Sequence, residues 1–220
     1  MATPKITLYF DLISPFAYMA YYMLRHSPVF AGCDKTYVPV LIGGIMKATG
    51  NLSPLFIKNK DKWINIERKR WAKFLDIPIC AGAPKGMPLR TLEVQRVLCA
   101  VAADYPAHFE ACLDALYKVV WVESNGEIVK PEGYMPILES VLGKDAALKV
   151  AEKIKLDDIK KQLAANTEAA LGAGSFGLPW MVCTNSKGET EAYWGVDHLG
   201  QVAAFLDLDV SSGKGFRALL

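Results

Sequence analysis

The chain has 220 residues, of which 52% are hydrophobic and 22% charged, enough apolar material for one large domain or a domain with an insertion. Its 25 basic and 23 acidic residues give a net charge of +2, so we expect neither nucleic acid nor an anionic membrane as a partner. No apolar run approaches the roughly 18 residues that cross a bilayer, and the N-terminus lacks the basic-then-apolar plan of a signal peptide.

Five cysteines are scattered along the sequence, and none forms a C-x-x-C pair. An odd number of separated cysteines in a chain of this length argues against a disulfide framework and favours a reducing intracellular compartment. The three histidines have no neighbouring ligand pattern. We therefore expect no metal site.

The first elements follow the order strand, helix, strand. Residues 5–10 (K-I-T-L-Y-F) alternate and are rich in β-formers, which predicts a strand. Ser14 and Pro15 suit the N-cap and the first position of a helix, and the apolar run at 16–24 predicts that this helix is buried. A second strand is predicted over residues 35–41, so the chain opens like a βαβ unit.

A long helical region follows, and strands return only near the C-terminus. Helical spacing predicts helices over residues 61–75, 89–103, 106–120, 135–142, 146–154 and 157–171, the last with Asp157 or Asp158 as its cap. Residues 180–184 and 191–194 predict a hairpin, and residues 196–206 predict a final helix. This order predicts an α/β domain, residues 1–45 and 175–220, interrupted by an all-helical insertion, residues 46–174.

Ser14 is the first residue with a chemical role to consider. A serine between a strand and a buried helix can point its hydroxyl toward open space. The N–H groups of the helix start favour a bound anion, and a thiolate is one. The same residue type also fits an ordinary N-cap, and spacing alone favours that interpretation.

The segment Gly177-Leu178-Pro179 precedes a predicted strand. An X-Pro bond in such a turn can be cis, and a cis bond before Pro179 would leave the Leu178 backbone free to pair with an extended peptide. A plain trans turn is the alternative, and most X-Pro bonds are trans.

Two further features are polar. Asp197 can cap the last helix, which spacing favours, or hold the ammonium group of a ligand. The basic window at residues 58–73 should be mostly a solvated helix face, from which one or two cations could meet a ligand carboxylate.

Together these segments resemble the kappa-class glutathione transferases. The resemblance rests on four stretches that occur in the same order through nearly the whole chain. They are residues 11–17 (D-L-I-S-P-F-A), residues 41–51 (L-I-G-G-I-M-K-A-T-G-N), residues 161–179 ending in F-G-L-P, and Gly195-x-Asp197. The same superfamily includes 2-hydroxychromene-2-carboxylate isomerases and DsbA-like disulfide oxidoreductases. The resemblance implies a thioredoxin-like domain with a helical insertion, in a homodimer that binds glutathione as co-substrate.

The resemblance also implies roles for individual residues. Ser14 matches the serine that faces the glutathione sulfur, and Pro15 and Phe16 lie beside it. Asn51 matches a glutathione-contacting asparagine. Lys60 falls about where the family has a ligand-facing lysine.

At the other end of the ligand, Leu178 matches the residue whose backbone pairs with the cysteinyl part, before a cis Pro179. Asp197 matches the acid that holds the γ-glutamyl ammonium. Where the family usually has Ser, Asp and Arg, this chain has Val196, Asp197 and His198. The serine hydroxyl is therefore lost, and only the backbone N–H of Val196 remains for the γ-glutamyl carboxylate.

The implied function is that of a glutathione transferase in detoxification. The glutathione thiolate would attack a hydrophobic electrophile or a peroxide. A glutathione-dependent isomerase of the 2-hydroxychromene-2-carboxylate type and a noncatalytic glutathione-binding protein are the alternatives. A disulfide oxidoreductase is disfavoured because residues 14–17 contain no cysteine. We expect a cytoplasmic location, with mitochondria and peroxisomes, where relatives occur, as the alternatives.

Overall fold

The computed structural model describes residues 2–213. Its strands are β1 (Lys5–Phe10), β2 (Asp34–Pro39), β3 (Trp180–Thr184) and β4 (Thr190–Trp194). Its α-helices are α1 (Pro15–His26), α2 (Ile42–Thr49), α3 (Lys60–Leu75), α4 (Leu92–Asp104), α5 (Phe109–Tyr117), α6 (Pro131–Leu142), α7 (Lys144–Lys153), α8 (Asp157–Gly172) and α9 (Leu199–Phe205). Shorter helical turns are η1 (Pro28–Phe30), η2 (Pro54–Phe56), η3 (Pro106–His108), η4 (Lys118–Val122), η5 (Gly126–Val129) and η6 (Val196–His198).

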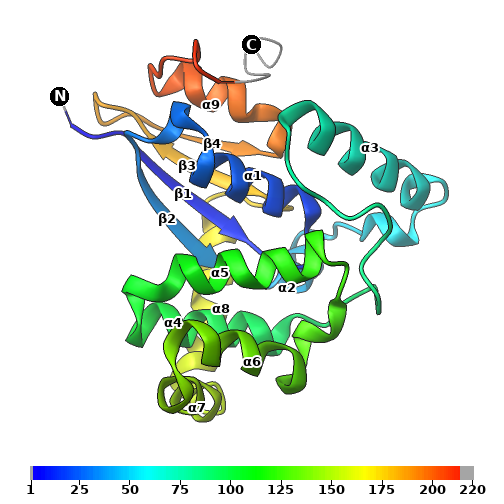
Figure 1. Ribbon diagram of the computed structural model, residues 1–220. Coiled ribbons are helices and arrows are strands. Elements are labelled where there is room, and N and C mark those ends of the chain that lie inside the picture. The colour runs from blue at the N-terminus through cyan, green and yellow to red at the C-terminus, as the bar shows by residue number, and fades with distance from the viewer. Residues whose placement is uncertain (1, 214–220) are drawn as a thin grey trace.

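The four strands form one mixed sheet in the order β2-β1-β3-β4 (Figure 1). β1 pairs in parallel with β2 and antiparallel with β3, and β3 pairs antiparallel with β4. Tyr9 near the end of β1 lies opposite Val38 of β2 and Trp180 of β3. The end of β1, where the chain turns toward Ser14, therefore lies beside the start of β3.

Helices cover both faces of this sheet, because alternate side chains of each strand point to opposite sides. Leu8 and Phe10 belong to the large core that includes α1, α4, α5 and α9. Tyr9 packs against a second cluster, in which Ala170 of α8 meets Ile45 of α2. α8 thus packs on the sheet although it lies within the predicted insertion, and the division at residues 46 and 174 stays a prediction.

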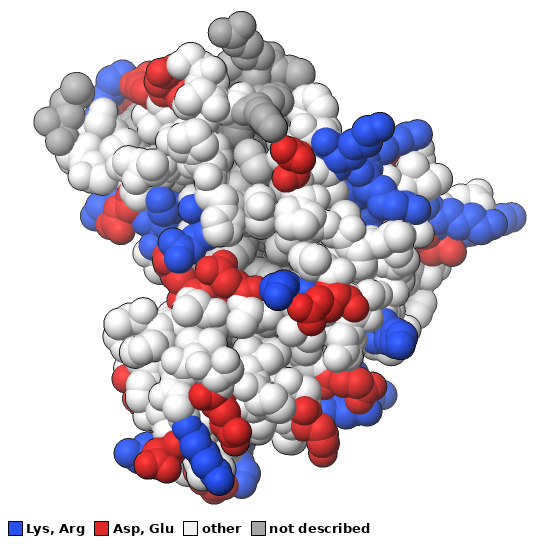
Figure 2. Space-filling model, in the orientation of Figure 1, with Lys and Arg blue, Asp and Glu red and all other residues white. Residues whose placement is uncertain are grey.

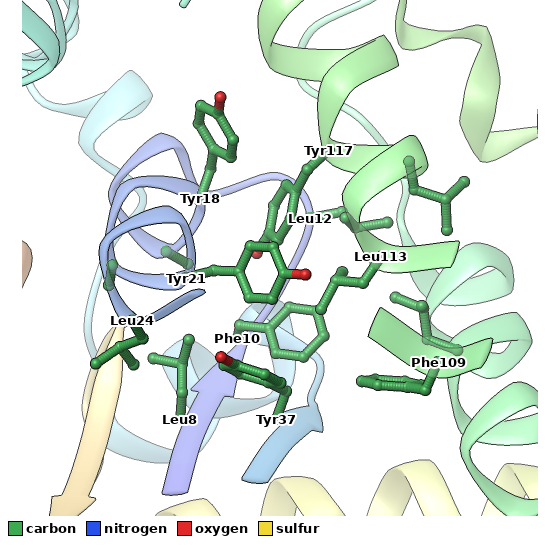
Figure 3. Packing of buried hydrophobic residues seen from close by; sticks show 14 of the residues in the cluster. Leu8, Phe10, Leu12, Tyr18, Tyr21, Leu24, Tyr37, Phe109, Leu113 and Tyr117 are labelled. Carbon is green, nitrogen blue, oxygen red and sulfur yellow. The ribbon is translucent and has the colours of Figure 1, made fainter. Parts of the chain in front are cut away.

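The large core joins the sheet to the helical region. In Figure 3, Tyr18 and Tyr21 of α1 meet Tyr117 of α5 above Phe10 of β1. The ring of Tyr117 lies 5.3 Å from each of the two α1 tyrosine rings, and 5.9 Å from that of Phe10. The predicted burial of the first helix is confirmed, and the sheet and the helical region share one core.

Most predicted elements are confirmed, with differences at their ends. The predicted helix over 106–120 is broken into η3, α5 and the π-helical turn η4, and the final helix into η6 and α9. Neither Asp157 nor Asp158 is the cap of α8, because both lie in the first turn of the helix and Leu156 is at the N-cap. Among residues 2–213, no helix has the length and apolar character needed to cross a membrane.

The sequence patterns did not predict α2, which contains Gly43 and Gly44 and has no capping side chain of its own. Its first N–H groups are satisfied from distant segments. Asp11 accepts from Ile42 N at 3.0 Å, and Thr167 Oγ1 accepts from Leu41 N at 3.1 Å. Tertiary contacts therefore stabilise a helix that local propensity disfavours.

Candidate functional site

Ser14 is the N-cap of α1. Its Oγ accepts a hydrogen bond from Ala17 N at 3.1 Å, and the residue is buried, so the N-cap prediction is confirmed. Within residues 2–213 the hydroxyl donates to no group. A serine hydroxyl has one donor as well as its acceptor lone pairs. The cap and the thiolate-donor interpretations are therefore compatible, because capping leaves the proton of Ser14 available.

The first turn of α1 favours an anion beside this hydroxyl. Pro15 has no N–H, and the N–H of Phe16 has no acceptor among the described residues. No acidic residue lies in the first turn, while Arg25 and His26 lie in the last. No acidic side chain of α1 itself therefore neutralises the partial positive charge of the helix start.

Asp11 lies directly before this turn and is fully buried. Its Oδ1 accepts from Ile13 N at 3.2 Å and its Oδ2 from Ile42 N at 3.0 Å, so it joins the start of α1 to the start of α2. Burial raises the pKa of the Asp11 carboxyl to about 6, although hydrogen bonds from Ile42, Thr91 and Ile13 oppose the rise. The sequence gives Asp11 no assigned role, although it follows a buried strand and opens the D-L-I-S-P-F-A stretch.

Asp11 makes the free energy of unfolding depend on pH. Its folded pKa of about 6 exceeds the ordinary 3.8 of the unfolded chain. Its stabilisation is therefore complete below about pH 4 and is lost as the pH rises to about 6. At 1.36 kcal/mol per pKa unit the loss is about 3 kcal/mol. We expect the stability advantage of the wild type over Asp11→Asn to fall by that amount in urea unfolding between about pH 4 and pH 7.

Asp157→Asn is the matched control, because Asp157 is exposed and its hydrogen bond with Lys160 lowers rather than raises its pKa. A stability difference between the wild type and Asp11→Asn that is the same at every pH would contradict the raised pKa of Asp11.

The Leu178–Pro179 peptide bond is cis, as the resemblance implied. Both residues are buried, and the backbone of Leu178 forms no hydrogen bond within residues 2–213. Pro179 O accepts from Gly195 N at 3.0 Å, and Trp180 pairs with Tyr9 of β1. Leu178 therefore offers an unused donor and acceptor near the chain that leads to Ser14.

Asn51, which follows the end of α2, contacts the loop that precedes the cis Leu178–Pro179 bond. Its Nδ2 donates to Phe176 O at 2.8 Å, and its Oδ1 accepts from Leu52 N at 2.9 Å. The side chain is exposed. Asn51 is thus held next to the loop that contains Leu178, although the sequence separates the two segments widely.

Asp197 lies in η6, which contacts α1. Its carboxylate caps no helix, since Gly195 is the N-cap of η6 and His198 that of α9, so the cap interpretation is wrong. The Asp197 side chain is 55% exposed, and His198 Nδ1 lies 3.5 Å from its Oδ2 without hydrogen-bond geometry. Val196 is buried, and its N–H has no acceptor among the described residues.

The position before Val196 and Asp197 requires glycine. Its φ is +94°, and a Cβ at that position would lie 2.2 Å from Asp197 Oδ1. The same glycine donates to Pro179 O, so one residue fixes both the cis-proline loop and the acid.

The basic window at residues 58–73 is mostly a solvated helix face, as predicted, because six of its seven basic residues are exposed. Lys60 begins α3 with an exposed side chain, and no hydrogen bond or ion pair within the described part of the chain links it to another candidate residue. Arg68 is the exception, because its side chain is buried. Its guanidinium donates to Cys80 O at 2.8 Å and to Gly82 O at 2.6 Å, which holds the loop after α3.

All five cysteines are buried and none is paired. Burial raises the pKa of the Cys99 and Cys183 thiols to about 12 and that of Cys112 to about 11. Buried thiols with raised pKa values are poor nucleophiles. A thiolate at the start of α1 therefore has to come from a ligand.

Comparison with known proteins assigns the fold. The family model of the DSBA-like thioredoxin domain matches residues 5–207. This chain belongs to the DSBA-like thioredoxin domain family. A solved structure of 2-hydroxychromene-2-carboxylate isomerase superposes on it with a TM-score of 0.77 and 21% identity, covering 92% of this chain and 94% of the other. The predicted thioredoxin-like fold with many added helices is confirmed.

Two relatives that are similar to this chain in sequence carry the names of enzymes. The chain is 29% identical over 207 residues to glutathione S-transferase kappa 1 of Homo sapiens, covering 91% of this chain and 90% of the relative. It is 24% identical over 201 residues to 2-hydroxychromene-2-carboxylate isomerase of Pseudomonas sp. (strain C18), covering 88% and 86%. The resemblance to the kappa class and its isomerase relatives is confirmed.

Proposed function

We propose that this protein is a glutathione transferase. The observation that carries the proposal is the start of α1, where Ser14 has an unused hydroxyl proton beside a helix N-terminus with no acidic residue in its first turn. The buried cysteines leave that position to a ligand's thiol. The likeness to relatives named glutathione S-transferase kappa supports glutathione as that ligand.

Glutathione would bind in an extended form along the residues described above. The backbone N–H and C=O of Leu178 pair with its cysteinyl part. Asp197 holds the γ-glutamyl ammonium, and the N–H of Val196 meets the adjacent carboxylate. Asn51 fixes the loop before Leu178, and Lys60 provides a cation toward the other end of the ligand. Pro15 and Phe16 border the sulfur.

Ser14 acts as a hydrogen-bond donor to the sulfur. A donor and a helix start both favour the thiolate over the thiol, so the bound thiol loses its proton at a lower pH than free glutathione. The thiolate then attacks an electrophilic carbon and displaces its leaving group. With a peroxide, the thiolate forms an S–O bond and breaks the O–O bond, and an alcohol leaves. A second glutathione thiol then attacks the sulfur of the resulting sulfenic acid, which gives the disulfide and water. The proposed biological role is the detoxification of hydrophobic electrophiles, carried out by a homodimer.

Glutathione binding is tested by thermal unfolding. A ligand at about 100 times its dissociation constant stabilises the native state by about 2.7 kcal/mol. For a chain of this size that is a rise of about 5–10 °C in the melting temperature. Cysteinylglycine is the matched control ligand, because it has the thiol but lacks the γ-glutamyl group that Asp197 would hold. An unchanged melting temperature at tens of millimolar glutathione would refute the proposal.

A glutathione-dependent isomerase is the second candidate, favoured by the relative of that name. There the thiolate adds to one substrate and later leaves it, so glutathione is not consumed. A product assay separates the two. Conjugation of a model aryl halide supports the transferase and rejects a noncatalytic binding protein, whereas isomerisation of a chromene carboxylate without loss of glutathione supports the isomerase.

A further inference from the structure

Buried polar side chains join the segments that follow β1 and β2. Gln95 of α4 donates from Nε2 to Phe10 O at 3.0 Å and to Val40 O at 2.7 Å, at the ends of the two strands. Asp11 comes directly after Phe10, and its carboxylate accepts hydrogen bonds from the chain that follows each strand. Asp11 and Gln95 are both fully buried. The start of α1 and the start of α2 are therefore connected below the surface.

On one side of this connection, Asp11 holds the turn that carries Ser14. Its main-chain O accepts from Ser14 N at 3.0 Å, and its Oδ1 accepts from Ile13 N at 3.2 Å. The N–H group that the carboxylate binds thus belongs to the residue immediately before Ser14. A change in the carboxylate should therefore displace the Ser14 hydroxyl.

On the other side, Asp11 holds the start of α2. This helix has eight residues and no capping side chain of its own, and Asp11 Oδ2 accepts from Ile42 N at 3.0 Å. Asn51 follows the end of the helix and donates to Phe176 O, in the loop before Leu178. A short rigid helix carries a displacement of its start to its end, because its internal hydrogen bonds hold it together. The carboxylate of Asp11 is therefore linked through α2 to the cis-proline loop.

We propose that the carboxylate of Asp11 positions the two halves of the ligand site, Ser14 on one side and the Leu178 backbone on the other. The inference rests on the proposed function, in which these groups meet the sulfur and the cysteinyl backbone of one glutathione molecule. Asp11 touches no ligand itself, because it is fully buried. Two groups that bind neighbouring atoms must keep a fixed separation, and a small displacement of either weakens binding.

The ionised form of Asp11 suits this role. A carboxylate only accepts hydrogen bonds, so it satisfies Ile13 N, Ile42 N and the Thr91 side chain together, whereas protonation turns one oxygen into a donor. Asp11 forms no ion pair within residues 2–213, and the Lys and Arg side chains that Figure 2 shows lie on the outside of the molecule. The titratable group that faces Asp11 is Tyr117 of α5, whose pKa is raised well above its ordinary value by burial and then by Asp11. Protonation of Asp11 therefore stabilises the fold but releases a contact that positions the site.

Titration calorimetry with S-methylglutathione tests the proposal, because the sulfur of this ligand is uncharged and the charge of Asp11 cannot act on a thiolate. Asp11→Asn keeps the shape of the side chain but places an amide NH2 against a backbone N–H. We expect its dissociation constant to exceed that of the wild type about 3- to 10-fold at about pH 7.5. At about pH 5 the wild type is protonated at Asp11, whose pKa is about 6, so the two constants should become nearly equal. The other titrating groups are common to both proteins.

Tyr134→Phe is the matched control, because it also removes one buried hydrogen bond, from Tyr134 Oη to Glu93 Oε1 at 2.8 Å, but between α6 and α4. It should bind S-methylglutathione like the wild type at both pH values. A loss of affinity in Asp11→Asn that is the same at both pH values would indicate a merely structural role and overturn the proposal. Unchanged affinity at about pH 7.5 would overturn it too.

Amide hydrogen exchange without ligand tests the path through α2. Asp11→Asn should exchange about 3- to 10-fold faster than the wild type in residues 11–17, 42–52 and 174–178. Thr167→Val loses the acceptor for Leu41 N but leaves the Ser14 turn intact, so it should speed exchange in the last two segments and not in the first. Faster exchange confined to residues 11–17 in Asp11→Asn would overturn the proposal. A wild type that binds no S-methylglutathione would refute the proposed function instead, and the exchange result would still decide whether Asp11 couples the two segments.

Discussion

Replacement of Ser14 should shift the pH dependence of glutathione conjugation. A charge-assisted hydrogen bond contributes about 1.5–3 kcal/mol, so its loss should raise the pKa of the bound thiol by about one to two units. Conjugation near neutral pH should then fall about 10- to 100-fold in Ser14→Ala and recover at alkaline pH. The field of the α1 N-terminus persists in the variant, so some activity should survive.

Because Ser14 also caps α1, three variants are needed to separate the two roles. Ser14→Ala loses both the cap, at about 1 kcal/mol, and the donor. Ser14→Gly also loses the donor, but glycine is an adequate N-cap and costs only a few tenths of a kcal/mol. Ser14→Thr keeps both. We expect the pH profiles of conjugation for Ser14→Ala and Ser14→Gly to share a midpoint at higher pH than that of the wild type. The profile of Ser14→Thr should match that of the wild type. A single midpoint for all four proteins would leave Ser14 as a helix cap only.

Replacement of Asp197 should weaken glutathione binding without destabilising the protein. Asp197→Asn removes the charge that would hold the γ-glutamyl ammonium, which is worth about 1–3 kcal/mol, or about 5- to 150-fold in the dissociation constant. The carboxylate caps no helix, so the unfolding free energy should stay nearly constant. Titration calorimetry and urea unfolding measure the two quantities.

Asp145→Asn is the matched control for Asp197, since Asp145 is also an exposed acid in the first turn of a helix, α7. It should leave glutathione affinity unchanged. Equal affinities for the wild type and Asp197→Asn would remove Asp197 from the site and leave the ammonium without a partner.

The elements that sequence patterns predicted well are those with local signals. β1 has the predicted bounds, because strand alternation needs no information from other segments. Ser14 and Pro15 correctly mark the start of α1 for the same reason. α2 was not predicted, because its Gly43-Gly44 pair disfavours a helix and its stabilising partners come from distant segments.

The candidate site divides in the same way. Ser14 follows from its local motif, and Pro179 from its place at the start of a strand. The contact of Asn51 with Phe176 O joins residues 125 positions apart, which no spacing rule reveals. Arg68 lies in a run of cations that predicts solvent exposure, but the carbonyls of the loop after α3 bury it. Asp197 looked like a cap, and only the backbone geometry of Gly195 shows that it is not one.

The most direct measurement of the central claim is the pKa of glutathione bound to the wild type. Thiolate absorbance in the ultraviolet, recorded as a difference spectrum with saturating glutathione across a pH series, reports that pKa without any second substrate. We predict a midpoint well below the value of about 8.5 for an ordinary thiol, and a return toward that value in Ser14→Gly. Glutathione that binds to the wild type and ionises at its free pKa would contradict the claim that the start of α1 activates the sulfur.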